Sequence, residues 1–142
     1  MSIWGRLFGV EKNRNYELGI RFFNEGRYEE AVEALEKAIA EVGRNDPDHA
    51  LGMFYAAEAH FHCGNSLFEE GRFEKALAHF EKAARENPGY PDLYYRMGVI
   101  RHRLGDADAA ADSLGRAIEL NPQYFEAVCY LGIVLFESGK RE

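Results

Sequence analysis

The chain is poor in the features of secreted, membrane-spanning and nucleic-acid-binding proteins. Its 142 residues include only two cysteines, Cys63 and Cys129, too few for the disulfide framework of a small secreted protein, so we expect both to be buried, reduced thiols. No apolar run approaches the roughly 20 residues that cross a bilayer. Acidic residues outnumber basic ones by 24 to 17, and the net charge of −7 argues against nucleic acid as a partner.

The first ten residues lack the long apolar core and the small-residue cleavage site of a secretory signal, so the cytoplasm is the expected location. Residues 1–11 are expected to form a separate amphipathic segment with a helix over 2–9, whose apolar face consists of Ile3, Trp4, Leu7 and Phe8. This segment can dock on the rest of the chain, bind a partner or another copy, or lie on a membrane surface. Because it contains a single Arg, we expect membrane attachment to be weak.

Motifs of catalysis and cofactor binding are also missing. The sequence has no Gly-rich phosphate loop and no local arrangement of Ser, His and Asp, so we expect neither an enzyme nor a cofactor. His60, His62 and Cys63 are residue types that bind zinc, but on a helix His62 points away from the other two, and no fourth ligand is spaced nearby. We therefore interpret His60 and Cys63 as packing residues and expect no metal site.

What the sequence does contain is a repeated pattern. A Gly-Arg-aromatic triplet begins at Gly26 and again at Gly71, each time followed by a charged stretch and then by Ala, Leu or Phe at helical spacing. A weaker copy begins at Gly105, and the interval from Gly71 to Gly105 matches the period of about 34 residues that is typical of stacked helical hairpins. These three glycines and Gly139 are expected to end the first helix of each hairpin. Glycines expected to let paired helices approach closely are Gly19, Gly64, Gly98 and Gly132.

This pattern, with Asn87-Pro88 and Asn121-Pro122 in matching places, resembles the tetratricopeptide repeat over residues 12 to 139. The resemblance implies an all-α, right-handed solenoid of about three and a half helical hairpins. It sets repeats near 12–45, 57–90 and 91–124, with a half repeat over 125–142, in a repeat domain covering 12–142. Helices are expected near 13–25, 28–43, 47–70, 73–86, 91–104, 107–120 and 124–138.

One interval departs from the period. Ala31 and Ala76 occupy matching positions but lie farther apart than one period, so about 11 residues are added between the first and second repeats. Asp46 and Pro47 favour an early helix start, and nothing breaks the helical pattern from there to Glu70. We expect the first helix of repeat two to begin near residue 47 and to project by about 16 Å, at 1.5 Å per residue.

The resemblance also implies a binding surface. In this family the first helices line a concave groove, and here the lining positions are mostly aromatic or apolar. The expected partner-binding residues are Tyr16, Ile20, Phe23, Phe61, Asn65, Phe68, Tyr95, Arg96, Val99, His102 and Arg103. Family members that hold a C-terminal carboxylate have Lys and Asn where Tyr16 and Ile20 stand, so a complete carboxylate clamp is not expected.

These observations predict a non-catalytic scaffold that binds a protein or peptide partner in an aromatic and apolar groove. Asn65 would offer hydrogen bonds to a ligand backbone, while Arg96 and Arg103, two turns apart on one helix, would favour acidic flanks. The alternative is a self-assembling module, a homo-oligomer formed through the groove, the N-terminal segment or the open C-terminal end. At that end an uncovered apolar stripe is expected at Val128, Leu131, Val134 and Leu135.

Overall fold

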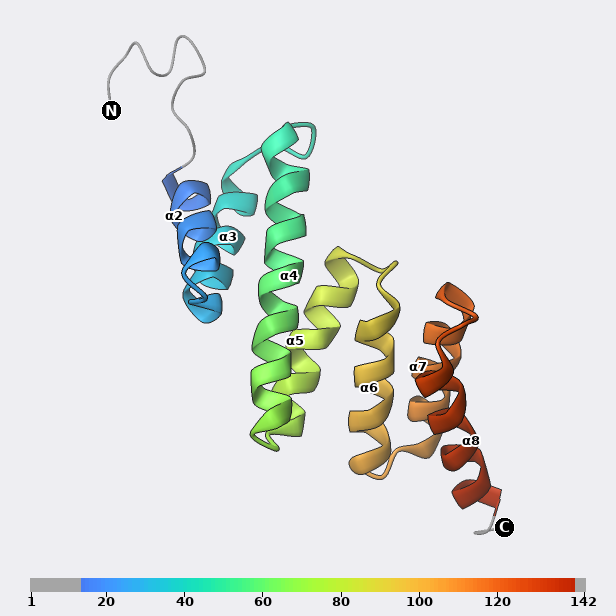
Figure 1. Ribbon diagram of the computed structural model, residues 1–142. Helices are drawn as coiled ribbons and strands as arrows, with labels where there is room; N and C mark the ends of the chain where they lie inside the picture. Colours follow the sequence, from blue (N-terminus) through green and yellow to red (C-terminus); the bar gives the residue numbers. More distant parts are fainter. Residues whose placement is uncertain (1–13, 140–142) are drawn as a thin grey trace, which may run out of the picture. The chain divides into compact units, whose positions relative to one another are not determined.

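The structure is a computed structural model that describes residues 14–139, and within this range it contains seven helices and no strand (Figure 1). The all-α fold class and the seven expected helices are therefore confirmed, each within a few residues. The helix expected over 2–9 lies outside the described residues. In the described range no helix is long and apolar enough to cross a membrane. The helices are α2 (Arg14–Asn24), α3 (Tyr28–Glu41), α4 (Pro47–Glu69), α5 (Phe73–Glu86), α6 (Pro91–Arg103), α7 (Ala107–Leu120) and α8 (Phe125–Gly139).

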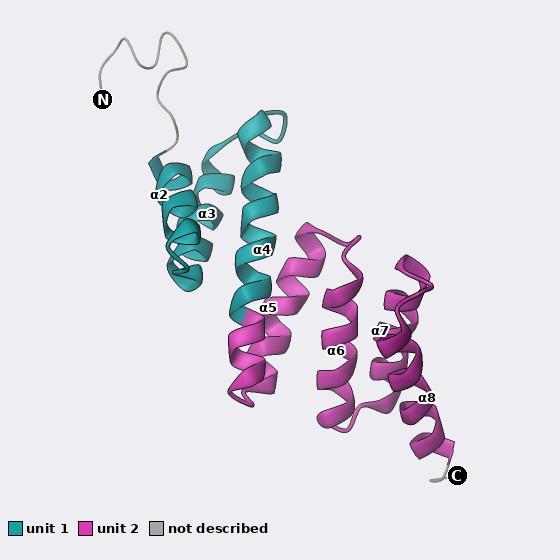
Figure 2. Ribbon diagram, in the orientation of Figure 1, with its two compact units in different colours: residues 1–63 teal, residues 64–142 magenta. Residues whose placement is uncertain are grey.

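The chain divides into two compact units, residues 1–63 and 64–142 (Figure 2). In the first unit α2 and α3 pair as a hairpin, and the first part of α4 packs on it. Its core consists of the buried residues Ala31, Val32, Leu35, Ala56, Ala59 and Cys63. In the second unit α6 and α7 form a hairpin between α5 and α8. The core between α7 and α8 consists of Ala110, Leu114, Ala117, Ala127 and Val134.

Three hairpins are closed by the same device, a first-helix glycine covered by a large side chain of the second helix. A Cβ atom on Gly19 would lie 2.5 Å from Cγ of Leu35, and a Cβ on Gly98 would lie 2.6 Å from Cγ of Leu114. On Gly64 it would lie 2.6 Å from a ring carbon of Phe80. We call the space over each of these glycines a glycine socket. The large side chain that fills this space is called the knob. All three knobs are fully buried, so the expected close approach at these glycines is confirmed.

Glycines also end the first helices. Gly26, Gly71 and Gly105 have φ values of 75°, 76° and 88°, in the left-handed region that residues with a Cβ rarely enter. The amide of Gly71 donates to the carbonyl of Phe68 at 3.0 Å, which satisfies a carbonyl group that the helix end leaves open. The predicted helix ends at these three glycines are confirmed, and Gly139 is the last residue of α8.

The added residues lie in a long α4, as expected, but they do not project freely. Gly52 is buried, and a Cβ atom there would lie 3.2 Å from Cγ1 of Ile39 and 3.9 Å from the ring of Tyr16. Ala56 is fully buried in the same core, while Phe54 on the other side of the helix is half exposed. The early turns of α4 therefore cover the α2–α3 hairpin, because the small residues on one side allow close packing.

The two cysteines differ in environment. Cys63 is buried, and burial raises the pKa of its thiol from 9.0 to about 11. Cys129 is exposed, so the expectation of two buried thiols is wrong for this residue. The reason is its place on α8: no helix among the described residues covers the side of α8 on which Cys129 lies.

Candidate functional site

In the first unit, Phe23, one of the expected binding residues of α2, takes part in an aromatic cluster. Phe23 meets the rings of Tyr28 and Tyr55 edge on, at centroid distances of 5.5 and 5.4 Å. Tyr28 also stacks on His62 of α4, with 4.3 Å between ring centroids. Offset and edge-to-face aromatic pairs each contribute about 0.5–1.5 kcal/mol beyond the area that they bury. Phe23 therefore holds α2, α3 and α4 together.

The other expected residues of this unit are at most partly exposed. Tyr16 and Ile20 are partly buried and pack against the core of the unit. Burial is the main cause that raises the pKa of Tyr16. Phe61 of α4 is only 8% exposed. Since a ligand can contact only the exposed part of a side chain, Phe61 offers it very little surface.

The histidine considered as a zinc ligand from the sequence is buried between two helices of the first unit. His60 has no exposed surface, and its Nε2 atom lies 3.0 Å from Oε1 of Glu36 on α3. Both ring nitrogens of a buried imidazole need hydrogen-bond partners, and this carboxylate is one such partner. His60 thus forms a polar link between α3 and α4 inside the first unit.

In the second unit, the structure brings three of the expected residues together around one aromatic ring. The guanidinium carbons of Arg96 and Arg103 on α6 lie 5.6 and 5.8 Å from the ring centroid of Phe68 on α4. Arg103 also lies 5.4 Å from the ring centroid of Phe73. Such cation–π contacts are worth about 0.5–1 kcal/mol at exposed sites, so they order the two arginines.

On the same two helices, α4 and α6, lie two polar atoms that the described part of the chain leaves without a hydrogen bond. They are Oδ1 of Asn65 and Nε of Arg96, and both atoms are buried. Nε of Arg96 is 3.9 Å from Oδ2 of Asp92, near enough for an ion pair but too far for a hydrogen bond. A buried polar atom without a partner costs about 1–3 kcal/mol. We call Asn65, Phe68, Arg96 and Arg103 the Phe68 face.

Two other expected residues of α6 are involved in packing. Val99 is only 6% exposed, so like Phe61 it has little surface for a ligand. Tyr95 contacts Tyr124 and Tyr130, with ring centroids 5.1 and 6.3 Å apart. Burial is the largest cause that raises the pKa of Tyr95. Tyr95 therefore belongs to the contact between α6 and the segment that leads into α8.

Next to Tyr95, a hydrogen bond that sequence reasoning missed fixes the start of α6. The hydroxyl of Tyr124 donates to Oδ1 of Asp92 at 2.5 Å. The pKa of Tyr124 is raised, first by burial and then by this hydrogen bond to a carboxylate. Because the two partners lie 32 residues apart in the sequence, the spacing within one helix gives no sign of the pair.

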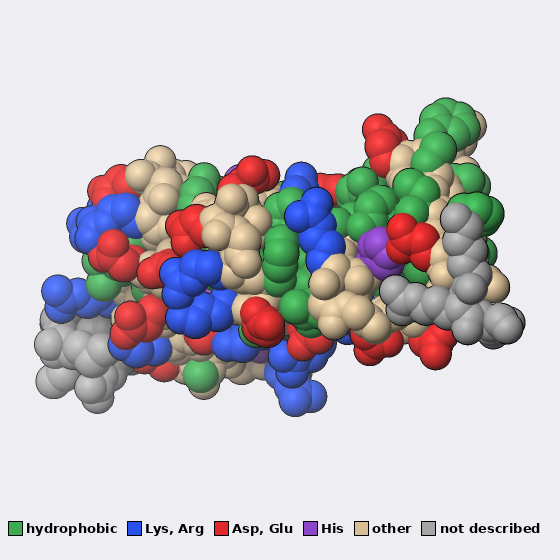
Figure 3. Space-filling view, turned by 90° about the horizontal axis from the view of Figure 1, so that it is seen from below, with side chains coloured by type: hydrophobic (Ala, Val, Ile, Leu, Met, Phe, Trp, Pro, Cys, Tyr) green, Lys and Arg blue, Asp and Glu red, His purple; other side chains and the backbone are tan. Residues whose placement is uncertain are grey.

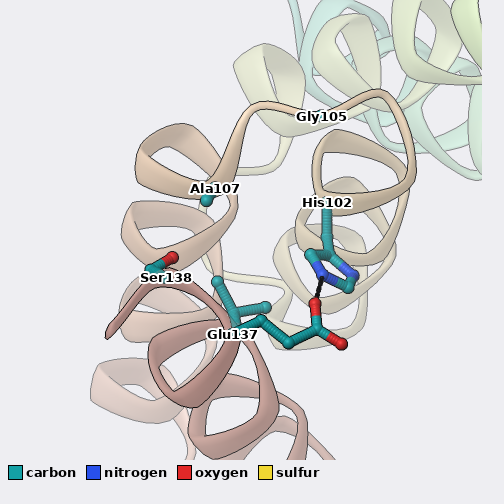
Figure 4. Close-up of a pocket in the computed structure, with 6 residues that line it drawn as sticks. His102, Gly105, Ala107, Glu137 and Ser138 are labelled. Carbon is teal, nitrogen blue, oxygen red and sulfur yellow. Dashed lines mark hydrogen bonds and ion pairs between the residues drawn. The ribbon is translucent and has the colours of Figure 1, made fainter. Parts of the chain in front are cut away.

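His102 is held between two first helices (Figure 4). Its Nδ1 atom lies 2.9 Å from the hydroxyl of Tyr130, and its Nε2 atom lies 2.6 Å from Oε2 of Glu137 on α8. The residues lining the small hollow beside it, of about 30 Å³, are His102, Gly105, Ala107, Val134, Glu137 and Ser138. That volume is far below the several hundred Å³ of a cofactor pocket, so the hollow is a packing feature.

Comparison with known proteins identifies the family. Two family models described as tetratricopeptide repeat match residues 16–65 and 91–124, and a third, described as TPR repeat, matches residues 64–105. The chain belongs to the tetratricopeptide repeat family. No curated protein matches this tetratricopeptide repeat chain in sequence.

Solved structures agree with this assignment. The crystal structure of MamA is 21% identical, with a TM-score of 0.60 over 96% of this chain and 75% of that one. The C-terminal TPR-containing domain of a putative FK506-binding protein from Plasmodium falciparum is 16% identical, with a TM-score of 0.61 over 90% and 89%. The first TPR of Spaghetti (RPAP3), bound to an HSP90 peptide, is 26% identical, with a TM-score of 0.52 over 88% and 90%. These likenesses establish the helical-repeat fold of the present tetratricopeptide repeat chain.

Proposed function

We propose that this tetratricopeptide repeat chain is a non-catalytic scaffold that binds a peptide segment of a partner protein on the Phe68 face. The observation that carries the proposal is the pair of buried polar atoms on neighbouring helices, Oδ1 of Asn65 and Nε of Arg96, that lack hydrogen-bond partners in the described part of the chain. Buried polar groups in native proteins are nearly always hydrogen-bonded, so an exception calls for an explanation. Both side chains are only partly buried, so they can turn outward, and a bound peptide then supplies the donor and the acceptor that these two atoms lack.

The chemistry of the face defines the ligand. Oδ1 of Asn65 accepts a hydrogen bond from a peptide amide, and Nε of Arg96 donates to a carbonyl or carboxylate oxygen. Arg96 and Arg103 place two positive charges beside Phe68 in a chain whose net charge is −7. The ligand is therefore an extended segment with an apolar side chain against Phe68 and acidic residues beside it, since guanidinium groups pair well with carboxylates.

A similar structure supports an acidic ligand. The first TPR of Spaghetti (RPAP3) is bound to an HSP90 peptide of sequence SRMEEVD, which has three acidic residues. In this chain Tyr16 and Ile20 occupy two positions at which family members that hold a terminal carboxylate have Lys and Asn. We therefore propose recognition of acidic side chains along the peptide and not of its free C-terminus.

A binding titration with labelled SRMEEVD peptide, followed by fluorescence anisotropy at low salt, tests this function. Arg96→Ala and Asn65→Ala are each expected to lower the affinity about tenfold, because each removes one hydrogen bond made only with the ligand. Arg116→Ala is the matched control, since Arg116 on α7 forms an ion pair with Glu119 at 3.2 Å and is not part of the Phe68 face. Amidation of the peptide terminus is expected to change the affinity less than twofold.

Two results would contradict the proposal. If both variants melt at the temperature of the original chain and bind the peptide equally well, the Phe68 face is not the binding site. If amidation abolishes binding, the chain recognises a terminal carboxylate after all, and the recognition of acidic side chains is wrong.

A further inference from the structure

Helix α8 is apolar on two opposite sides, and only one of them is covered by the described residues. Ala127 and Val134 are buried against the rest of the second unit. On the other side, large side chains recur at helical spacing and remain exposed, with Phe125 at 70% and Phe136 at 64%. In Figure 3, hydrophobic side chains gather over the part of the second unit that contains α8. We call this exposed side the α8 outer face; its residues are Phe125, Val128, Cys129, Gly132, Leu135 and Phe136.

At the centre of the α8 outer face is a glycine that no described residue covers. Gly132 occupies the same place in its repeat as Gly98 does in the repeat before it. A Cβ atom on Gly98 would lie 2.6 Å from its knob, whereas a Cβ atom on Gly132 would meet nothing within 4 Å among the described residues. The helix that covers the glycine in the other three hairpins has no counterpart among residues 14–139.

The three filled sockets show which helix fits. Each covering helix has Ala one turn before its knob and Ala one turn after it, and these alanines are at most 2% exposed. The knob is Leu or Phe, and the small neighbours let the helix backbone approach. The three sets are Ala31, Leu35 and Ala38; Ala76, Phe80 and Ala83; and Ala110, Leu114 and Ala117.

The net charge around α8 also indicates which kind of helix can bind the α8 outer face. Residues 106–139, which include α7 and α8, contain six acidic residues and one basic residue, Arg116. The negative charge around α7 and α8 therefore attracts a basic helix and repels an acidic one. At 0.1 M salt this effect extends over roughly 10 Å. A second folded copy of the chain has no matching helix to offer from its described residues, because all three of its knobs are already fully buried.

We propose that the α8 outer face binds an amphipathic helix of a partner protein, which packs on α8 as the second helix of a hairpin packs on the first. The helix has a Leu or Phe knob with Ala at positions −4 and +3, and Lys or Arg on its flanks. Its knob enters the socket at Gly132. This site is separate from the Phe68 face and does not depend on peptide binding there.

The chain provides its own probes. A synthetic peptide of residues 72–87 carries the knob Phe80 and one more basic than acidic residue, and a peptide of residues 106–121 carries the knob Leu114 and three more acidic than basic residues. In titrations with the full chain, the first peptide is expected to bind at least tenfold more tightly than the second. The difference is expected to narrow as salt screens the charges. Phe80→Asp in the first peptide is expected to abolish its binding.

Variants of the chain locate the site. Gly132→Ala is expected to fold, because its Cβ has open space, but to lower the affinity for the 72–87 peptide at least tenfold, because the added methyl group occupies the place of the knob. The matched control is Gly115→Ala on α7, a helical glycine that also has nothing within 4 Å of an added Cβ. That variant is expected to bind the peptide as the original chain does. Arg96→Ala is expected to leave this binding unchanged, which separates the site from the Phe68 face.

Several results would overturn the proposal. One is the absence of binding by the 72–87 peptide at millimolar concentration, and another is equal binding by the Gly132→Ala variant. Sedimentation of the original chain as a dimer that Phe136→Asp dissociates would show that a second copy covers the face. Tighter peptide binding by a Leu7→Asp chain would show that the chain's own N-terminal segment covers it.

Discussion

Gly98 in α6 and Gly132 in α8 stand at the same place in the repeat, yet their surroundings differ completely. A methyl group added to Gly98 would collide with Leu114, and one added to Gly132 would meet open space among the described residues. Glycine in the middle of a helix costs roughly 0.5–1 kcal/mol relative to alanine, so its presence needs a reason. At Gly98 the reason is the knob of α7. At Gly132 no described residue lies against the glycine, and in our proposal the reason is the knob of a partner helix.

The largest expected effect compares a knob with an exposed leucine. Leu114 is fully buried over Gly98, whereas Leu135 on the α8 outer face is 56% exposed. Leu114→Ala is expected to lower the free energy of unfolding by about 3 kcal/mol, because it removes buried methyl groups and leaves a cavity. Leu135→Ala is expected to change it by less than about 0.5 kcal/mol. Urea denaturation followed by circular dichroism measures both, and similar losses in the two variants would show that α8 is covered in solution.

The second effect compares the two glycines directly. Gly98→Ala brings a Cβ atom to 2.6 Å from Cγ of Leu114 and to 3.3 Å from the carbonyl oxygen of Ala110, so α6 and α7 must move apart. We expect a net loss of about 1–2 kcal/mol of unfolding free energy. Gly132→Ala is expected to gain about 0.5–1 kcal/mol from helix propensity alone. Thermal melts decide the comparison, and a gain in both variants would mean that the filled socket is not tight.

A third effect concerns the buried thiol. The pKa of Cys63 is raised by burial to about 11, so the folded chain keeps the thiol proton to higher pH than the unfolded chain does. The free energy of unfolding is therefore expected to hold this contribution below about pH 9 and to lose it between pH 9 and 11, by on the order of 1–2 kcal/mol. Denaturation curves at several pH values measure the slope. Cys63→Ala is the control, and an unchanged slope in that variant would assign the effect to other groups.

The last prediction concerns the reactivity of the two thiols and involves the smallest change in stability. It tests directly whether the α8 outer face is covered. Exposed Cys129 is expected to react with a thiol reagent in the folded chain within minutes, and buried Cys63 only after denaturation. Titration of thiols with and without denaturant distinguishes them. Addition of the 72–87 peptide is expected to slow the reaction of Cys129, because this residue lies on the α8 outer face. Equal rates with and without a saturating amount of peptide would place the peptide elsewhere.

Most of the fold was predictable because glycine and proline residues mark where the helices end and begin. Gly26, Gly71 and Gly105 occupy the left-handed conformation that ends a helix, and Pro47 and Pro91 begin α4 and α6. These effects are local, so a single sequence reveals them. The packing of the early turns of α4 was not predictable in the same way. It depends on the fit between Gly52 and Ile39, two residues that come together only in the folded chain.

For the candidate site, the sequence predicted on which side of a helix each residue lies but not how exposed that residue is. The repeat register predicted Phe68, Arg96 and Arg103 as binding residues, and the structure brings these three together. The position of a residue in the repeat does not, however, predict how deeply its side chain is buried. Phe61 and Val99 are buried in the structure. Nor does that position predict partners that lie one repeat away.

His102 shows this second limit. A search of its own helix finds no acidic neighbour at the spacing of one turn, yet its Nε2 atom lies 2.6 Å from Oε2 of Glu137, one repeat later in the sequence. That contact is set by the packing of α8 against α6, which the spacing within one helix does not reveal.

The glycine sockets restrict the number of residues that each hairpin can contain. The sequence interval from glycine to knob is the same in all three filled sockets, so the turn inside a hairpin cannot gain or lose a residue without moving the knob away from its glycine. The interval from a knob to the next glycine is free of this constraint, because it is clearly longer from Leu35 to Gly64 than from Phe80 to Gly98. The additional residues of α4 therefore lie between hairpins, the place where the fold tolerates a change in length.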